Sequence, residues 1–153
     1  FLVFFLFELS MSRIHFELPE HFTFCTELQV YIGHVNQGGH LDHAQLLTLV
    51  SEARVRFFQA LGYLEANIEG LAVVVGDIVA QYRSEAFHGE TLRVQMLADD
   101  FNPYGFDLVF SMTEKTSQRE VARGKVGVVF VDPEHKRVAL LPQAFRQRLD
   151  RLK

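Results

Sequence analysis

One helical pattern stands among strand patterns in this sequence, and it constrains the fold more than any other feature. Asp42 is a good N-cap, Gln45 three residues later makes a variant of the capping box, and Gly62 is a typical helix stop. Between them, one set of side chains recurs at steps of three and four, which places it on one face of a helix of about 18 residues. The set consists of Leu46, Leu47, Val50, Arg54, Phe57, Phe58 and Leu61.

Strand patterns lie on both sides of this helix. They are rich in β-branched and aromatic residues or alternate apolar with polar side chains, and they cover 22–35, 71–83, 91–98, 104–113 and 121–132. Pro142 opens a short charged helix over 143–152. Because most strand connections are short, we expect a largely antiparallel sheet with the long helix on one face, which is an α+β arrangement.

The composition describes a single domain of ordinary character. The chain has 153 residues, 48% of them hydrophobic, and its 15 Phe predict a deep core or an apolar subunit interface. A net charge of −4 without a basic run argues against nucleic acid as a partner. The single cysteine, Cys25, fits a reducing compartment, and no spacing typical of a metal site occurs.

The N-terminal stretch reads differently from the rest. Within residues 1–10, the apolar run 1–7 is far shorter than the roughly 20 residues of a membrane span, and it has no features of a signal peptide. Met11 followed by Ser12 looks like a natural start. We therefore expect 1–10 to be an extension from cloning or from the choice of start codon, and 11–153 to be one domain; an added edge strand is the alternative reading of 1–10.

Two motifs carry a family resemblance. Gly39-His40-Leu41-Asp42-His43-Ala44, followed by Ser51-Glu52-Ala53-Arg54, resembles the signature of the 4-hydroxybenzoyl-CoA thioesterase family, which has Gly-His-Val-Asn-Asn and then Glu-Glu-Ala-Arg. The segments 82–94 and 121–142 are similar to later parts of that family, so the resemblance covers roughly 22–150.

The resemblance implies a hotdog fold, in which a curved, mainly antiparallel sheet wraps one long central helix. It further implies a cytoplasmic enzyme that hydrolyses an acyl-CoA thioester to free acid and CoA, and whose subunits form a homodimer or homotetramer. In that case coenzyme A is part of the substrate and no separate cofactor or metal is needed. We expect the acyl chain to lie in an apolar tunnel between helix and sheet.

The chain departs from the family at one position that matters for the chemistry. Asn36 stands where the family has its catalytic Asp, and an amide cannot act as a nucleophile or general base at neutral pH. It can still hydrogen-bond a thioester carbonyl or a water molecule. Either another group performs the work of the carboxylate, or the activity is low, or the reaction differs.

Thioester hydrolysis needs donors for the developing oxyanion and a group that activates water. Bare backbone at Gly38 and Gly39, with free N–H groups of the first helical turn and the helix dipole, could provide the donors. Asp42 is either the helix cap, which we favour, or the base; His40 is equally a base or a hydrogen-bonded loop residue. Glu52 is the remaining catalytic candidate.

Glu52 lies opposite the apolar stripe and four residues before Arg56, so a solvent-side salt bridge is the favoured interpretation. Arg54 lies on the stripe and must either extend its head to solvent or pair with an acid. Substrate contacts are expected from Gly38, Leu41 and His43 at the turn, and from Arg83 and Arg123 for the phosphates of CoA.

Two other function classes remain open from the sequence. A non-catalytic module that binds acyl-CoA or an acyl carrier is favoured by Asn36. A hotdog dehydratase or hydratase is less favoured, because its usual motifs are not visible. Release of CoA from a panel of thioesters separates the first alternative from hydrolysis, and hydration of an enoyl-CoA would support the second.

Overall fold

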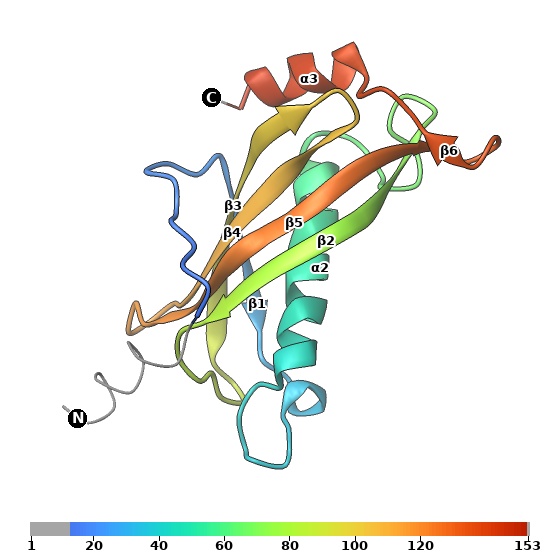
Figure 1. Cartoon of the computed structure of the whole chain (residues 1–153). Helices are drawn as coiled ribbons and strands as arrows, with labels where there is room; N and C mark the ends of the chain where they lie inside the picture. Colours follow the sequence, from blue (N-terminus) through green and yellow to red (C-terminus); the bar gives the residue numbers. More distant parts are fainter. Residues whose placement is uncertain (1–12, 153) are drawn as a thin grey trace.

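The computed structural model describes residues 13–152, and the proposed extension 1–10 lies outside them. A six-stranded antiparallel sheet with the order β1-β3-β4-β5-β2, and with the short β6 on β5, curves around the helix α2 (Figure 1). The elements are β1 Phe24–Gln29, η1 Ile32–His34, α2 His43–Ala60, β2 Ala72–Tyr82, β3 Thr91–Asn102, β4 Gly105–Glu114, β5 Glu120–Asp132, β6 Arg137–Val138 and α3 Gln143–Asp150. This is the α+β hotdog arrangement that the sequence predicts.

The long helix begins and ends as predicted, but its buried face is rotated. Leu49 and Ala53 are buried, whereas Leu47 is only partly buried and Arg54 lies beside the buried face. Arg54 pairs with Glu65 at 2.5 Å, which is the acid-paired alternative. The buried face of α2 consists of Leu46, Leu49, Val50, Ala53, Phe57 and Phe58.

The first strand is shorter than the predicted 22–35. Val30 still pairs with the segment before β3, through its N–H to the carbonyl of Glu90 and its carbonyl to the N–H of Gly89. The chain then turns into η1, where His34 Nδ1 accepts a hydrogen bond from the Tyr31 N–H at 3.0 Å. The strand pattern was wrong here because this local side-chain bond and Gly33 favour a turn.

Phenylalanine fills the space between helix and sheet. The fully buried aromatic side chains include Phe57 and Phe58 from α2, Phe106 and Phe110 from β4, Phe130 from β5 and Phe145 from α3. Six of the 15 Phe therefore lie in the core rather than at an interface. Because these rings pack against one another, the interior that we expected to hold an acyl chain is occupied by side chains within one subunit.

The sheet has two edges of different kinds. β1 forms one edge and β2 the other, and the loop between β1 and α2 lies at one end of the sheet (Figure 1). Among the described residues, no helix is both long and apolar enough to cross a membrane.

Candidate active site

A tight turn precedes α2 and contains the Gly-Gly pair. The Gly39 N–H donates to the Asn36 carbonyl at 3.0 Å, and the Asn36 N–H donates to the His40 carbonyl at 2.9 Å. Gly39 has a φ of +84°, in the left-handed region that favours glycine, and a Cβ built there would meet no atom within 4 Å. The turn is therefore open on the side of Gly39, as close approach of a substrate requires.

Two backbone hydrogen bonds hold this turn in place. The Leu41 N–H donates to the Ala86 carbonyl at 2.7 Å, and the Asp42 N–H donates to the His34 carbonyl at 2.9 Å. In the predicted capping box, the Gln45 side chain would accept a hydrogen bond from the Asp42 N–H. In the structure, that N–H instead donates to the carbonyl of His34 in η1. Leu41 is buried at 6% exposure, so the expected substrate contact is instead a core residue.

Asp42 is the N-cap of α2. Its Oδ2 accepts from the N–H groups of Ala44 at 2.9 Å and Gln45 at 3.3 Å. The expectation of several free amides in the first turn was therefore wrong, because the cap uses two of them. Among residues 13–152, the N–H groups of His40 and His43 have no hydrogen-bond acceptor, and that of His43, the first residue of α2, lies at the positive end of the helix dipole.

Glu85 is the residue that the sequence analysis missed. It lies between β2 and β3, beside Ala86, and its Oε1 is 3.6 Å from His40 Nε2. The other ring nitrogen of His40, Nδ1, lies 3.4 Å from the Leu41 carbonyl oxygen. The only sequence signal for Glu85 was that it lies in the segment 82–94, which resembles the family. The sequence analysis assigned no catalytic role to any position in this segment.

Asn36 contributes a buried polar atom without a partner. Its Oδ1 accepts no hydrogen bond from any residue in the described part of the chain. A Cβ on Gly38 would lie only 3.2 Å from Asn36 Oδ1 and 3.1 Å from His40 Nε2, so a side chain at this position would crowd both atoms, and the two atoms lie together beside the glycine. Since an unsatisfied buried acceptor costs about 1–3 kcal/mol, a hydrogen-bond donor from a ligand or water is expected here.

Tyr82 connects the last residue of β2 to the start of α2. Its hydroxyl donates to the His43 carbonyl at 3.1 Å, and the two rings meet edge to face with centroids 6.4 Å apart. Burial, and secondly the negative charge of Asp42, raise the pKa of Tyr82 above 10.0. The hydroxyl therefore stays protonated and remains a donor at neutral pH. His43 itself is 77% exposed at its side chain, 3.7 Å from Asp42 Oδ1.

Glu52 lies at a different place. It forms the expected salt bridge with Arg56 at 2.9 Å, and both side chains line a groove of about 560 Å³ between α2 and β1. His34 also lines this groove, but the residues from Asn36 to Asp42 do not. The structure gives Glu52 no contact with the turn, and its catalytic role finds no support.

The two arginines expected at the CoA phosphates also lie away from the turn. Arg83 and Arg123 both form ion pairs with Glu120, and Arg123 Nη1 donates to the Phe16 carbonyl at 3.1 Å. Neither contacts Gly38, His40 or His43. Because the two guanidinium groups share one carboxylate, one positive charge is left over beside Glu120. This charge lies on the side of the sheet along which residues 16–19 run.

Comparison with known proteins agrees with this architecture. A 1,4-dihydroxy-2-naphthoyl-CoA thioesterase from Synechocystis has a similar fold, with a TM-score of 0.76, 20% identity and coverage of 83% of this chain and 95% of that chain. A DHNA-CoA thioesterase from Staphylococcus aureus has a TM-score of 0.75 at 15% identity, covering 84% and 89%. A hypothetical protein from Thermus thermophilus has a TM-score of 0.74 at 20% identity, covering 84% and 98%.

No curated protein matches the sequence. A family profile described as the thioesterase-like superfamily matches residues 30–149, which is most of the chain and includes the turn, α2 and the whole sheet apart from β1. The hotdog arrangement, the glycine turn and this match agree with one another. The chain belongs to the thioesterase-like superfamily.

Proposed function

We propose that this chain is an acyl-CoA thioesterase that releases free acid and CoA and works as a homodimer. Membership of the thioesterase-like superfamily supports thioester hydrolysis in general. The observation that carries the proposal is the turn that is open at Gly39, where the buried, unpaired Asn36 Oδ1 lies beside His40. Such a polar pair next to a helix N-terminus fits a site that holds water close to a developing oxyanion.

The reaction divides between two groups of atoms. The N–H groups of His40 and of His43, the latter at the positive end of α2, stabilise the thioester carbonyl oxygen as it becomes negative. Water adds to the carbonyl carbon, the carbon–sulfur bond breaks, and the sulfur leaves as CoA after gaining a proton. One oxyanion donor contributes about 2.7–4 kcal/mol to the barrier in other acyl-transfer enzymes.

The second subunit enters the proposal through β2. This edge strand exposes Val74, Val75, Ile78 and Tyr82 by 40–46%, and no described strand pairs with its outer edge. Antiparallel pairing of two β2 strands would continue the sheet across both subunits. Because Tyr82 contacts His43, that pairing also brings the second subunit close to the turn, which one subunit leaves open.

Substrate and location are proposed from the similar proteins, the charges near β2 and the cysteine content. The similar DHNA-CoA thioesterases suggest that aromatic acyl-CoA thioesters belong in a first panel beside short and long aliphatic ones. Arg83 and Arg123 share the single carboxylate of Glu120, so one positive charge is left over. We propose that this charge meets a CoA phosphate when the second subunit places the substrate beside it. The single cysteine supports a role in the cytoplasm, with no cofactor beyond the CoA of the substrate.

The test is CoA release across that panel of acyl-CoA thioesters. Chromatographic detection of CoA is preferable to a thiol reagent, because the exposed Cys25 would react with the reagent. For the preferred substrate we expect kcat/KM of at least about 10⁴ M⁻¹ s⁻¹, the lower end of ordinary enzymes. His40→Ala serves as the matched inactive variant.

A second outcome would favour the binding module. Asn36 in the position of the family carboxylate is the specific observation for that alternative. Tight binding of acyl-CoA in calorimetry, with no CoA released beyond the His40→Ala background for any thioester, would contradict the enzyme and support the module.

A further inference from the structure

The surroundings of the His40 ring suit a proton acceptor. A neutral imidazole has one N–H and one lone pair, whereas both nitrogens of His40 face acceptors: the Leu41 carbonyl at 3.4 Å from Nδ1 and the Glu85 carboxylate at 3.6 Å from Nε2. With the N–H on Nδ1, the lone pair of Nε2 is free. Once Nε2 takes up a proton, its new N–H faces a carboxylate that stabilises the cation.

Asn36 explains why a separate base is needed. Its buried Oδ1 can accept a hydrogen bond from a water molecule but cannot take a proton from it. Asn36 Oδ1 and His40 Nε2 lie together beside Gly38, at 3.2 and 3.1 Å from the position that a Cβ would take there, so a water molecule that donates to the amide oxygen would also face the imidazole. The amide thus orients the water, and the proton must go to the histidine.

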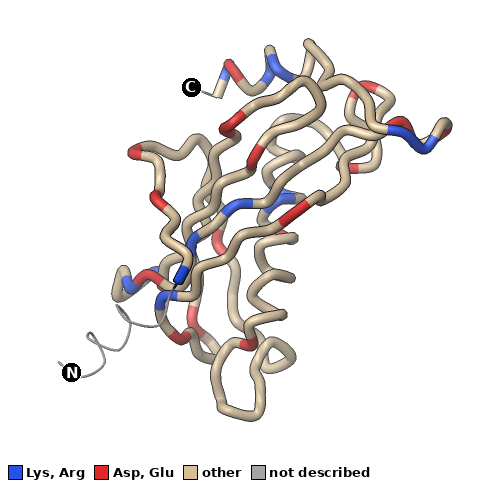
Figure 2. The backbone as a smooth tube through the Cα atoms, viewed as in Figure 1, with Lys and Arg blue, Asp and Glu red and all other residues tan. Residues whose placement is uncertain are grey.

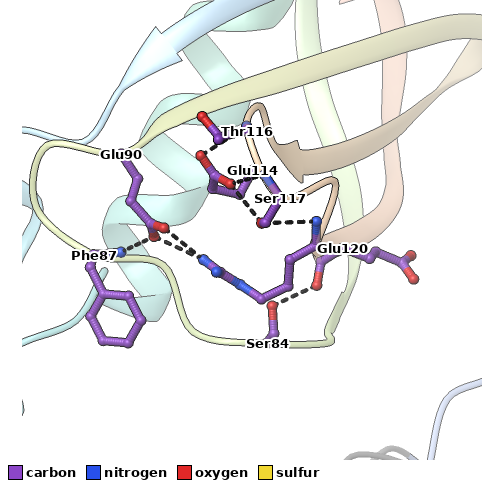
Figure 3. A network of polar contacts seen from close by, with 8 residues as sticks. Ser84, Phe87, Glu90, Glu114, Thr116, Ser117 and Glu120 are labelled. Atoms are coloured by element: carbon purple, nitrogen blue, oxygen red, sulfur yellow. Dashed lines mark hydrogen bonds and ion pairs between the residues drawn. The ribbon is translucent and has the colours of Figure 1, made fainter.

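The segment that carries Glu85 is firmly attached to the sheet. Arg119 makes two hydrogen bonds to Glu90 at 2.8 and 3.0 Å, and Glu90 Oε1 accepts from the Phe87 N–H at 2.7 Å (Figure 3). Ser84 Oγ donates to the Glu120 carbonyl at 2.6 Å. Bonds on both sides of Glu85 therefore fix its backbone opposite the turn, while the Leu41–Ala86 bond joins the two segments directly.

We infer that Glu85 is a positioning residue that holds His40 as the general base of hydrolysis, an inference that rests on the proposed thioesterase function. His40 Nε2 removes one proton from the water that Asn36 orients, and the water oxygen forms a bond to the thioester carbonyl carbon. As the tetrahedral intermediate collapses, the carbon–sulfur bond breaks and the proton passes from Nε2 to the CoA sulfur. The carboxylate of Glu85 stabilises the imidazolium between these two transfers.

Steady-state kinetics of four variants test this role. We expect His40→Ala to lower kcat by at least about 100-fold, and Glu85→Gln to lower kcat by at least about tenfold with KM unchanged. Glu85→Asp keeps the charge and should recover part of the loss. Glu134→Gln, an exposed glutamate at the turn after β5, is the matched control and should have wild-type kcat.

Two readouts separate this role from a structural one. If Glu85 acts through His40, Glu85→Gln lowers kcat no further in the His40→Ala background. Added imidazole should also restore activity to His40→Ala, since it supplies the missing base. Wild-type kcat in Glu85→Gln, full additivity in the double variant, or failure of imidazole to rescue would each overturn the inference while hydrolysis by the wild type stands. A wild type that releases no CoA would instead overturn the proposed function itself.

Discussion

The two edges of the sheet differ in how their backbone is covered. At β1, Arg56 Nη1 donates to the Glu27 carbonyl and to the Thr26 hydroxyl, both at 3.0 Å, and Lys115 pairs with Glu27 at 2.9 Å. At β2, eleven residues contain one charged side chain, Asp77, and the strand is almost free of charge along its length (Figure 2). One edge has charged groups over its backbone, and the other exposes apolar ones.

This difference favours one edge for the proposed contact with a second subunit. Proteins commonly protect edge strands with charges, prolines or covering side chains, because an open edge pairs with other strands. β1 has such protection from α2 and from the β4–β5 hairpin, whereas β2 has only a bulge between Val75 and Asp77. The site turn is linked to β2 through Tyr82 and His43, so the unprotected edge is also the one beside the proposed chemistry.

The largest expected effect comes from placing a charge on the open edge. The variant Ile78→Lys places a positive charge near the middle of β2, at a side chain that is 42% exposed. Burying that ammonium group in a paired edge would cost several kcal/mol, so we expect a monomer in light scattering at micromolar concentration. If the site needs both subunits, kcat/KM falls by at least about 100-fold, because the turn loses its cover.

The matched variant places the same charge on the other edge. Gln29→Lys, on the exposed side of β1, should leave both the oligomeric state and kcat/KM unchanged. A wild type that is already monomeric, or an Ile78→Lys variant that stays dimeric, would contradict the assignment of β2 as the interface. A fully active monomer of Ile78→Lys would contradict the need for both subunits at the site. Loss of the dimer in Gln29→Lys alone would transfer the interface to β1.

A smaller effect is expected from the link between the open edge and the turn. Tyr82→Phe keeps the ring contact with His43 and removes only the hydroxyl that donates to the His43 carbonyl. We expect a loss of about 0.5–1.5 kcal/mol in unfolding free energy. With the first residue of α2 less firmly held, kcat should fall by about threefold to tenfold at unchanged KM. Tyr104→Phe, at an exposed tyrosine after β3, is the control.

The elements of this fold follow from local sequence signals. Asp42 and Gly62 mark the ends of α2 because capping is a short-range interaction, and the strand patterns place four of the strands within a few residues. The error at 22–35 arose from a bond between neighbours, Tyr31 and His34, that a strand pattern does not reveal. Which strand forms an edge depends on pairing across the whole chain, so the exposure of β2 could not be predicted from periodicity.

The site was predictable only in part, for a similar reason. The turn at Gly38 and Gly39 and the cap at Asp42 are contiguous in sequence, and the resemblance pointed to them. Glu85 lies 45 residues from His40 along the chain and meets it only because Leu41 bonds to Ala86. Arg83 and Arg123 fit a phosphate by residue type alone, and the structure pairs them with Glu120 instead.

A pH-dependent effect is expected at the hairpin beside the protected edge. The Ser117 hydroxyl, with the N–H groups of Ser117 and Thr116, lowers the pKa of Glu114 from 4.5 to about 2 (Figure 3). Because the folded pKa is the lower one, the carboxylate adds stability above pH 4.5, and this contribution is lost as the pH falls towards 2. The difference in melting temperature between wild type and Glu114→Gln should therefore shrink with acidification. An equal difference at neutral and acidic pH would contradict this account.

The smallest effect is expected where the protected edge meets that hairpin. Lys115 and Glu27 are 54% and 47% exposed at their side chains, so water screens their attraction. Lys115→Ala should lower the unfolding free energy by no more than about 1 kcal/mol, and the difference should vanish near 1 M salt. The dimer should persist, because its proposed interface is at β2, and because Arg56 still covers the β1 edge when Lys115 is removed. New oligomers of Lys115→Ala would show that β1 stays unpaired only because this charge repels a partner, and the two edges would then differ in degree rather than in kind.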